Sequence, residues 1–241
     1  MKTQLSILIK LIPAYLAVYS LQAQTYHDLD INNIKARFYA GGDLSNNGST
    51  SGPNFEVPKG SGAHTIYAGN MWIGGLDGSG SLRLAGQTYS QSGRDFWAGP
   101  LDTINVSIDS LTSVQWNKVW KINRTTVDSC KAGSFGSNPP ASILNWPAMG
   151  NAAKNNAKYL APFFDKNSNG TYDPTSGDCP CIKGDQALYF IFNDQKAHTE
   201  TGGQSMGLEI QGMAYSINDP SDTSLHHTIF VNYKVINRSS Y

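Results

Sequence analysis

The sequence predicts a mainly β fold, an antiparallel β-sandwich-like domain with long loops and little helix. Three observations favour it. The composition combines 24 Gly, 12 Tyr, 9 Phe and 5 Trp with only 15% charged residues, which suits turns and aromatic-rich sheets. Short segments alternate apolar and polar residues with a period of two, as strands with one buried face do. Seven or more such segments follow one another with few helical patterns between them, which favours a sandwich over a parallel α/β sheet.

The first segment is an export signal rather than part of the fold. Lys2 precedes an apolar stretch over residues 5–21, and a small-residue pattern follows that ends at Ala23. This is the layout of a Sec signal peptide, so we expect cleavage after Ala23. Lys10 and Pro13 interrupt the stretch, which falls short of the roughly 18 apolar residues of a membrane-spanning helix. No cysteine follows the cleavage region, so we expect a mature protein without lipid.

We interpret residues 1–23 as the signal peptide and residues 24–241 as a single β-rich domain, long enough to bury a sizeable core. Removing the two signal-peptide lysines from the 18 basic residues leaves 16 against 18 acidic ones, a formal charge of −2. Nucleic acids and anionic membranes are bound by dense cationic faces. The sequence therefore argues against a nucleic-acid partner and, with the signal peptide removed, against membrane insertion.

The strand patterns of the first half begin at residue 34. Residues 34–40 alternate apolar and polar side chains, and a Gly-Gly pair at 41–42 ends this strand. Two apolar, aromatic runs follow, over residues 64–73 and 82–89. The link between them, residues 74–80, is dense in glycine. A glycine-rich link between two strand-like runs predicts a β-hairpin.

The middle of the chain is less regular. Residues 104–108 alternate again and predict a strand. Trp116, Val119 and Trp120 fit helical spacing, yet residues 119–122 fit a strand equally well. Residues 132–160 are rich in Pro, Asn and Gly and predict a loop, with at most a short helix over residues 152–159.

The last third contains the clearest strands. Residues 187–192 form a continuous apolar run, and residues 208–217 and 229–235 alternate. The chain reaches Tyr241 soon after the last pattern, without a closing loop. We therefore expect residues 229–235 to be a strand whose neighbours lie partly beyond Tyr241, and the domain to be truncated at its C-terminal end.

Five phrases of the sequence carry a family resemblance: DINNIKAR (30–37), FEVPKG (55–60), WIGGLD (72–77), DFWAGP (95–100) and KGDQA (183–187). Together they resemble the N-terminal region of large secreted proteins of Bacteroidota, which usually end in a type IX secretion sorting domain. The resemblance spans nearly the whole mature chain, although the sorting domain itself is not in this sequence. It implies a secreted or cell-surface protein, and it carries over no catalytic residues.

The sharpest chemical motif is DKNSNGTYD over residues 165–173. Asp, Asn and Asn at alternate positions followed by Gly match the first half of an EF-hand loop, in which oxygen donors converge on calcium. The second half departs from that pattern, because Ser176 replaces the bidentate Glu and Pro174 opposes an exiting helix. Locally the segment resembles the shorter calcium loops of thrombospondin type 3 and dockerin-like repeats.

We therefore predict a structural calcium ion at this loop. Side-chain oxygens supply all of its ligands except one, a backbone carbonyl from the threonine: Asp165, Asn167, Asn169, Thr171, Asp173 and Asp178. The alternative is a surface turn whose Asn and Asp side chains bond their own backbone.

The three cysteines belong to a compartment that permits disulfides. Cys179 and Cys181 are separated only by Pro180, and so small a ring strains a bond between them. We therefore expect Cys130 to pair with one of the two, which leaves one free thiol.

Three weaker motifs have structural interpretations. Residues 203–207 fit the G-x-S-x-G pattern, which needs a strand before the serine and a helix after it; we expect a glycine-rich turn before a strand instead. His198 and Glu200 lack a third metal ligand at recognisable spacing, so we expect solvated loop residues. His226 and His227 are adjacent in a predicted strand, so their side chains point to opposite faces.

Two classes of function stay open. The leading one is a non-enzymatic, calcium-stabilised module of a secreted or cell-surface protein, acting in adhesion, matrix assembly or ligand binding, with a glycan or another cell-surface component as candidate partner. Exposed aromatic rings would support a sugar-stacking platform, although tryptophans supply so much buried area that we expect most of these rings in the core. The candidates are Trp72, Phe96, Trp97, Trp116, Trp120 and Trp146.

The alternative is a secreted, glycosidase-like hydrolase. Such an enzyme needs two carboxyl groups that face each other across a cleft, about 5 to 10 Å apart. The candidate carboxylates are Asp95, Asp102, Asp185, Glu200 and Glu209.

Overall fold

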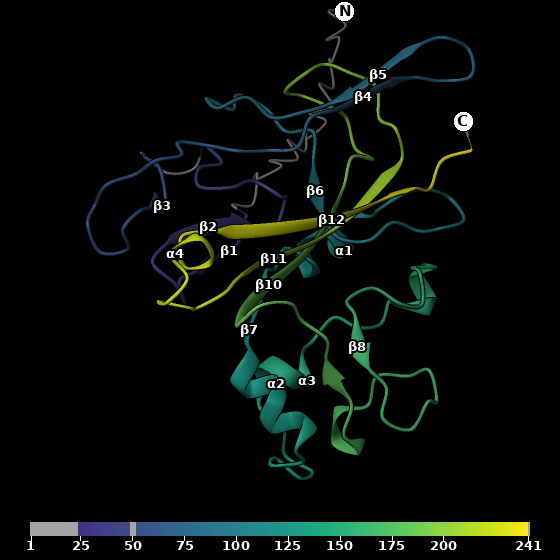
Figure 1. The fold of residues 1–241 in the computed structure, drawn as a ribbon. Coiled ribbons are helices and arrows are strands. Elements are labelled where there is room, and N and C mark those ends of the chain that lie inside the picture. Colours follow the sequence, from purple (N-terminus) through teal and green to yellow (C-terminus); the bar gives the residue numbers. More distant parts are fainter. Residues whose placement is uncertain (1–23, 49–51, 241) are drawn as a thin grey trace, which may run out of the picture.

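The structure is a computed structural model that describes residues 24–48 and 52–240. The predicted signal peptide, residues 1–23, lies outside the described residues. The fold is mainly β with few helices, as the sequence predicted. Its strands form antiparallel sheets of three, five, two and two strands (Figure 1).

The five-stranded sheet is the centre of the molecule. Its order is β12 (Ile229–Asn237), β11 (Leu208–Ser216), β10 (Gln186–Asn193) and β6 (Trp97–Ala98), and β7 (Trp120–Asn123) also pairs with β10. The β10–β11 register runs over the whole length of β10, and every residue of β10 is buried. This explains why the sequence of β10 is continuously apolar rather than alternating.

Two hydrophobic cores lie on the two faces of this sheet. Successive side chains of a strand point to opposite faces, and β10 divides its residues accordingly. Leu188, Phe190 and Phe192 belong to the first core together with residues of the N-terminal strands. The three residues that alternate with them belong to the second core, together with residues of the helical region: Ala187, Tyr189 and Ile191. The central sheet is therefore the middle layer of the fold.

The first core is covered by the N-terminal sheet of β1 (Tyr26–Leu29), β2 (Lys35–Tyr39) and β3 (Phe55–Glu56). β2 is the strand predicted from the first alternating pattern. It ends at the Gly-Gly pair for a steric reason. Gly42 has a φ of +91°, and a Cβ there would lie 2.6 Å from the ring of Phe192.

The predicted hairpin is present as β4 (Ile73–Leu76) and β5 (Leu82–Ala85), which project beyond the central sheet (Figure 1). Asp77 closes the turn, because its carboxylate accepts hydrogen bonds from the backbone N–H groups of Ser79 at 2.9 Å and Ser81 at 3.0 Å. The strands are shorter than the apolar runs that predicted them. The flanking residues, including Trp72 and Tyr89, lie in irregular segments.

The second core is covered by helices and loops of the middle region (Figure 1). Helix α2 (Arg124–Lys131), which the sequence did not predict, buries Val127 and Cys130 against this core. The remaining elements are short: α1 (Ser110–Gln115), α3 (Ala141–Leu144), η1 (Ala152–Lys154), β8 (Phe163–Phe164), η2 (Pro174–Ser176), β9 (Cys179–Pro180) and α4 (Thr223–His226).

Two predictions of local structure were wrong. Residues 104–108 do not form a strand: residues 103–106 form a turn, and Ser107 makes only an isolated bridge to Asp102. The turn forms because Asp102 accepts hydrogen bonds from the backbone N–H groups of Ile104 and Asn105 at 2.8 and 2.9 Å. His226 and His227 lie at the end of α4 rather than in a strand. In both places an Asp side chain bonds to nearby backbone and overrides the apolar pattern; at α4 this residue is the N-cap Asp222.

β12 forms one edge of the central sheet. It pairs with β11 over nine residues, and no other strand in the described part of the chain pairs with it. The N–H of Arg238 donates to the carbonyl of Gly207 at 2.9 Å, and hydrogen-bonded pairs alternate along an antiparallel ladder. The backbone groups that point away from β11 are therefore those of Ile229, Val231, Tyr233, Val235 and Asn237.

We expect the protein spanning residues 24–241 to self-associate through this edge as its concentration rises, because an open strand edge pairs with other chains. Val235 is 49% exposed, so Val235→Lys places a charge on the edge without disturbing the core. Sedimentation velocity should show less association for Val235→Lys than for wild type, and Val235→Thr should behave like wild type. A wild-type protein that stays monomeric at every concentration would contradict this prediction.

Candidate functional site

The first half of the predicted calcium loop is organised by its own side chains. Asp165 accepts hydrogen bonds from the backbone N–H groups of Gly170 at 2.7 Å and Asn169 at 3.2 Å. The Oδ1 atom of Asn167 accepts from the Asn169 N–H at 3.1 Å, and the Oδ1 atom of Asn169 accepts from the Thr171 N–H at 2.8 Å. Each carbonyl or carboxylate oxygen has more than one lone pair, so these bonds leave acceptor capacity for a cation.

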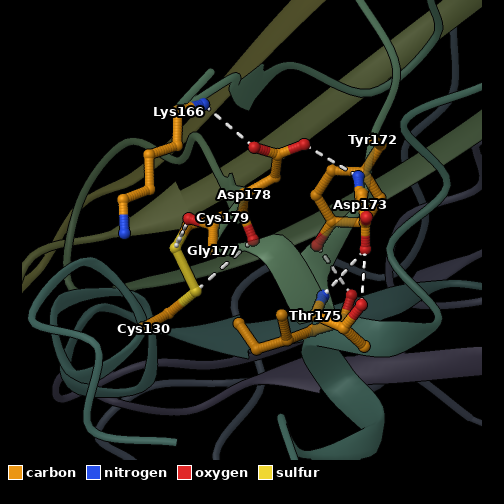
Figure 2. The surroundings of a disulfide bond; sticks show 9 residues. Cys130, Lys166, Tyr172, Asp173, Thr175, Gly177, Asp178 and Cys179 are labelled. Atoms are coloured by element: carbon orange, nitrogen blue, oxygen red, sulfur yellow. Dashed lines mark hydrogen bonds between the residues drawn. A yellow bond between two sulfur atoms is a disulfide. The ribbon is translucent and has the colours of Figure 1, made fainter. Parts of the chain in front are cut away.

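The second half holds its carboxylates in different bonds. Asp173 caps η2 and accepts from Thr175 and Ser176, and the side-chain hydrogen bond from Ser176 is the largest cause that lowers its pKa. Asp178 is buried. Its two oxygens accept from the backbone N–H groups of Lys166 at 2.9 Å and Asp173 at 2.7 Å, so it ties the two halves of the loop together (Figure 2).

The six predicted ligands thus fall into two hydrogen-bonded groups, one over residues 165–171 and one over residues 173–178. Nowhere in residues 24–48 and 52–240 do three His, Cys, Asp or Glu side chains gather as a metal site would need. The first group contains only one residue of these types and relies on two asparagines. The geometry fits the self-bonded turn, and it leaves oxygen atoms of the first group available to calcium.

A disulfide lies directly beside this loop. It joins Cys130 of α2 to Cys179 of β9, with an S–S distance of 2.09 Å and a sequence separation of 49 (Figure 2). This is one of the two pairings that the sequence left open. Cys181 is an exposed free thiol. Because Cys179 follows Asp178, the disulfide fixes the end of the loop to α2.

Two of the candidate hydrolase residues, Asp95 and Glu200, contact each other through the Asp95 carboxylate and the Glu200 backbone, and both side chains accept hydrogen bonds from backbone groups. Asp95 is fully buried and accepts from the N–H groups of Gly86 at 3.1 Å and Glu200 at 3.0 Å. Glu200 in turn accepts from the Gly93 N–H at 2.6 Å. Burial raises the pKa of Glu200, but hydrogen bonds, first that from Thr88, lower it below its usual value. This pair therefore holds loops together.

The other three carboxylates each accept hydrogen bonds from different groups of the protein. Glu209 is buried and accepts from Arg238 and the Leu101 N–H, at 2.9 and 3.0 Å. Asp185 accepts from the Asn218 N–H at 2.8 Å. Asp102 lines a hollow of about 150 Å³.

Asp102 shares that small hollow with Asp109. Backbone hydrogen bonds, from Asn105 to Asp102 and from Thr112 to Asp109, are the largest causes that lower the pKa of each carboxyl group. A glycosidase needs one carboxyl group that stays protonated at its working pH. Both groups here are ionised at neutral pH, so this hollow does not provide the acid.

His198 was wrongly predicted to be a solvated loop residue. Its side chain is buried, with Nδ1 2.6 Å from the carbonyl oxygen of Leu84 and Nε2 2.7 Å from the carbonyl oxygen of Asp194. Both ring nitrogens therefore face backbone carbonyl oxygens of the protein. The carboxylates of Asp95 and Asp194 lie 3.9 and 3.8 Å from the ring. His198 therefore joins β5 to the loop after β10.

The candidate aromatic platform is mostly core, as expected. Phe96 and Trp146 are buried. Trp97, Trp116 and Trp120 are partly buried. The exception is Trp72, which is 59% exposed.

Two hollows in the surface are lined by these tryptophans. The Trp72 hollow has a volume of about 390 Å³ and the Trp116 hollow about 660 Å³, both within the range of ligand pockets. The Trp72 hollow is lined by Ala68, Gly69, Asn70, Trp72, Gln87, Thr88, Tyr89 and Gln91. The Trp116 hollow is lined by Thr25, Tyr26, His27, Gln115, Trp116, Lys118, Val119, Trp120, Asn145, Pro147 and Met149.

Comparisons of the chain with protein-family models, curated proteins and solved structures found no match. The resemblance to secreted proteins of Bacteroidota therefore stays a prediction. No helix within the described residues is long and apolar enough to span a bilayer.

One buried carboxylate lies behind the Trp72 hollow. Asp43 is 1% exposed, and its Oδ1 atom accepts hydrogen bonds from the side-chain amides of Asn70 and, at 2.8 Å, Gln91. Burial is the largest cause that raises the pKa of Asp43, to about 6. The folded state therefore binds this proton more tightly than the unfolded chain, whose Asp pKa is about 3.9.

The sign of the resulting pH dependence follows from linkage. The stability that Asp43 contributes is fully present below pH about 4 and is lost as the pH rises through about 6. We expect the free energy of unfolding to fall by on the order of 1 kcal/mol between pH 5 and pH 7.5, measured by urea unfolding. Asp43→Asn should flatten this slope. Asp77→Asn is the control, because the pKa of Asp77 is lowered to about 2 and lies outside the window. An unchanged slope in Asp43→Asn would contradict the assignment.

Proposed function

We propose that this chain is an exported, calcium-stabilised β-rich module that binds a ligand outside the cell and catalyses no reaction. The signal-peptide pattern, the resemblance to secreted Bacteroidota proteins and the buried Cys130–Cys179 disulfide support export, since such disulfides persist in oxidising compartments. Adhesion and matrix assembly are the settings in which such a module acts.

The observation that carries the proposal is the bonding of the acidic side chains. Each of the five candidate catalytic carboxylates accepts hydrogen bonds from the protein itself, and two of them, Asp95 and Glu209, have no exposed surface. These bonds hold loops and strand ends together, whereas a catalytic acid must reach the substrate.

The calcium part of the proposal rests on the loop from Asp165 to Asp178. Its first half offers oxygens from Asp165, Asn167 and Asn169 at alternate positions, held in place by the backbone bonds described above. An ion bound there would neutralise part of the negative charge of the loop. It would also stiffen the segment that leads into β9 and the disulfide.

The absence of catalysis is testable on the purified protein spanning residues 24–241 with its disulfide intact. We expect no release of reducing ends from neutral or acidic polysaccharides, and N-terminal sequencing of the exported protein should begin at Gln24. Turnover that is lost in Glu200→Gln or Asp102→Asn would overturn the proposal in favour of the hydrolase. An extracellular protein that retains Met1 would overturn the assignment of export by a cleaved signal peptide.

A further inference from the structure

The indole of Trp72 is held in place before any ligand arrives. Its Nε1–H donates to the carbonyl oxygen of Gln87 at 2.9 Å, which fixes the direction of the ring. A Cβ placed on Gly86 would lie 2.8 Å from Cδ2 of the indole and 3.1 Å from both Cε2 and Cε3. Cδ2 is a ring-fusion atom surrounded by bonded atoms in the ring plane, so a point at these distances lies above the ring face. Gly86 therefore supports one face of the indole, and the ring stays 59% exposed.

A second exposed aromatic ring lines the same hollow. Tyr89 is 74% exposed, and it contacts Tyr67, which is 50% exposed and lies outside the lining of the hollow. Their ring centroids are 6.3 Å apart with an interplanar angle of 75°, an edge-to-face contact. Aromatic rings carry a negative face, which attracts the positively polarised C–H groups of a sugar ring. Two exposed rings in the lining of one hollow, with a third in contact with Tyr89, indicate a binding surface rather than a core.

The polar groups that line the hollow are uncharged, and hydrogen bonds to carboxylates outside the lining orient them. Asn70 and Gln91 line the hollow, and both donate to the buried carboxylate of Asp43. Thr88 donates through its N–H, at 3.0 Å, and its hydroxyl to Glu200. The Oδ1 atom of Asn70 is buried and has no hydrogen-bond partner in the part of the chain that the structure describes. Fixed amides of this kind hydrogen-bond to hydroxyl groups, and none of the lining residues offers a charge to an ionic ligand.

The Trp116 hollow has a different character. Lys118 and His27 line it, and Trp120 packs against Tyr189 of the second core with ring centroids 6.3 Å apart. Its tryptophans therefore serve the core, and their faces are not free in the way that the Trp72 indole is.

We propose that the Trp72 hollow binds a neutral carbohydrate chain, with Trp72 stacked on one sugar ring and the amides of Asn70 and Gln91 bonded to its hydroxyl groups. The proposal rests on the proposed function, because it names the ligand class of the exported module. Asp43 and Gly86 are positioning residues: the first orients the two amides and the second supports the indole.

The test is isothermal titration calorimetry of the protein spanning residues 24–241 with four neutral probes: cellohexaose, laminarihexaose, maltohexaose and xylohexaose. We expect at least one of them to bind with a Kd below about 1 mM. Trp72→Ala should weaken that binding by roughly tenfold or more, as expected for a tryptophan at the centre of a site. Gly86→Ala should weaken it too, because the new methyl group collides with the indole.

Two control variants separate this site from a general loss of structure. Leu76 lies in β4, the strand that follows Trp72, is 72% exposed and does not line the hollow, so Leu76→Ala should bind within about twofold of wild type. Trp116→Ala should also keep binding, because that tryptophan lines the other hollow. The melting curve of each variant shows whether it is folded.

The proposal fails if none of the four hexaoses binds, if Trp72→Ala binds as well as wild type, or if only an acidic chain such as polygalacturonate binds. Absence of both binding and turnover would remove the carbohydrate site and leave the non-catalytic module standing. Binding accompanied by cleavage of the bound hexaose would support the carbohydrate site and refute the non-catalytic module.

Discussion

Reduction of the Cys130–Cys179 disulfide is expected to lower the free energy of unfolding by about 4 kcal/mol, because the bond closes a loop of about 50 residues. In the chain-entropy account, cross-linking so long a loop removes many conformations from the unfolded chain. Both cysteines also belong to the second core, so their loss removes packed sulfur atoms. The effect should therefore be seen in the double variant Cys130→Ala/Cys179→Ala as well as in the reduced wild type.

Urea unfolding of oxidised and reduced protein measures this difference. Cys181→Ser is the matched control, because Cys181 is an exposed free thiol, and its unfolding curve should coincide with that of wild type. Peptide mapping of the unreduced protein should find the link from Cys130 to Cys179. A link from Cys130 to Cys181, or identical curves with and without reductant, would refute the assignment.

The central strand β10 could be predicted because its hydrophobic pattern agrees with its tertiary environment: it lies between two cores and is a continuous apolar run. The edge strand β12 was predicted from an alternating sequence, although its burial does not alternate and residues 232–235 are all exposed. The pattern at residues 104–108 is equally regular, yet it forms a turn, because Asp102 bonds to the backbone within three residues. The period of the apolar residues does not reveal that an Asp side chain competes with a neighbouring strand for the backbone N–H groups.

The candidate sites also divide into features that the local sequence predicts and features that it does not. The short spacing of Cys179 and Cys181 strains a bond between them, so the sequence left two possible pairings for Cys130. The burial of His198 depends on carbonyl oxygens of Leu84 and Asp194, one of them 114 residues away, so no local pattern reveals it. Trp72 looked like the other tryptophans. The available signal was its place in the first strand of the predicted hairpin, two residues after Asn70.

Calcium is expected to stabilise the fold through the loop from Asp165 to Asp178. After reduction of the disulfide, this is the second large change expected in the free energy of unfolding. Binding to the folded state alone adds about 2.7 kcal/mol when free calcium exceeds the Kd a hundredfold. Extracellular modules bind calcium at about 10⁻⁴ to 10⁻³ M, so the full effect needs calcium at about 10 mM or above. The melting temperature should rise with calcium and fall with chelator. Reduction of the disulfide should weaken the response, because the bond anchors Cys179, the residue next to Asp178.

The sharpest variant for this loop is Asp165→Asn. The asparagine can still accept a backbone hydrogen bond through its oxygen, but it loses the charge that attracts calcium. If calcium binds, this variant should melt close to wild type in chelator and gain little from calcium. Asp77→Asn is the matched control, since Asp77 also bonds to backbone N–H groups in a turn, far from the loop in sequence, and should keep the full calcium response. Equal melting curves of the wild type with calcium and with chelator would refute the calcium site. Residues 165–178 would then be a self-bonded turn whose two halves are joined by the Asp178 carboxylate.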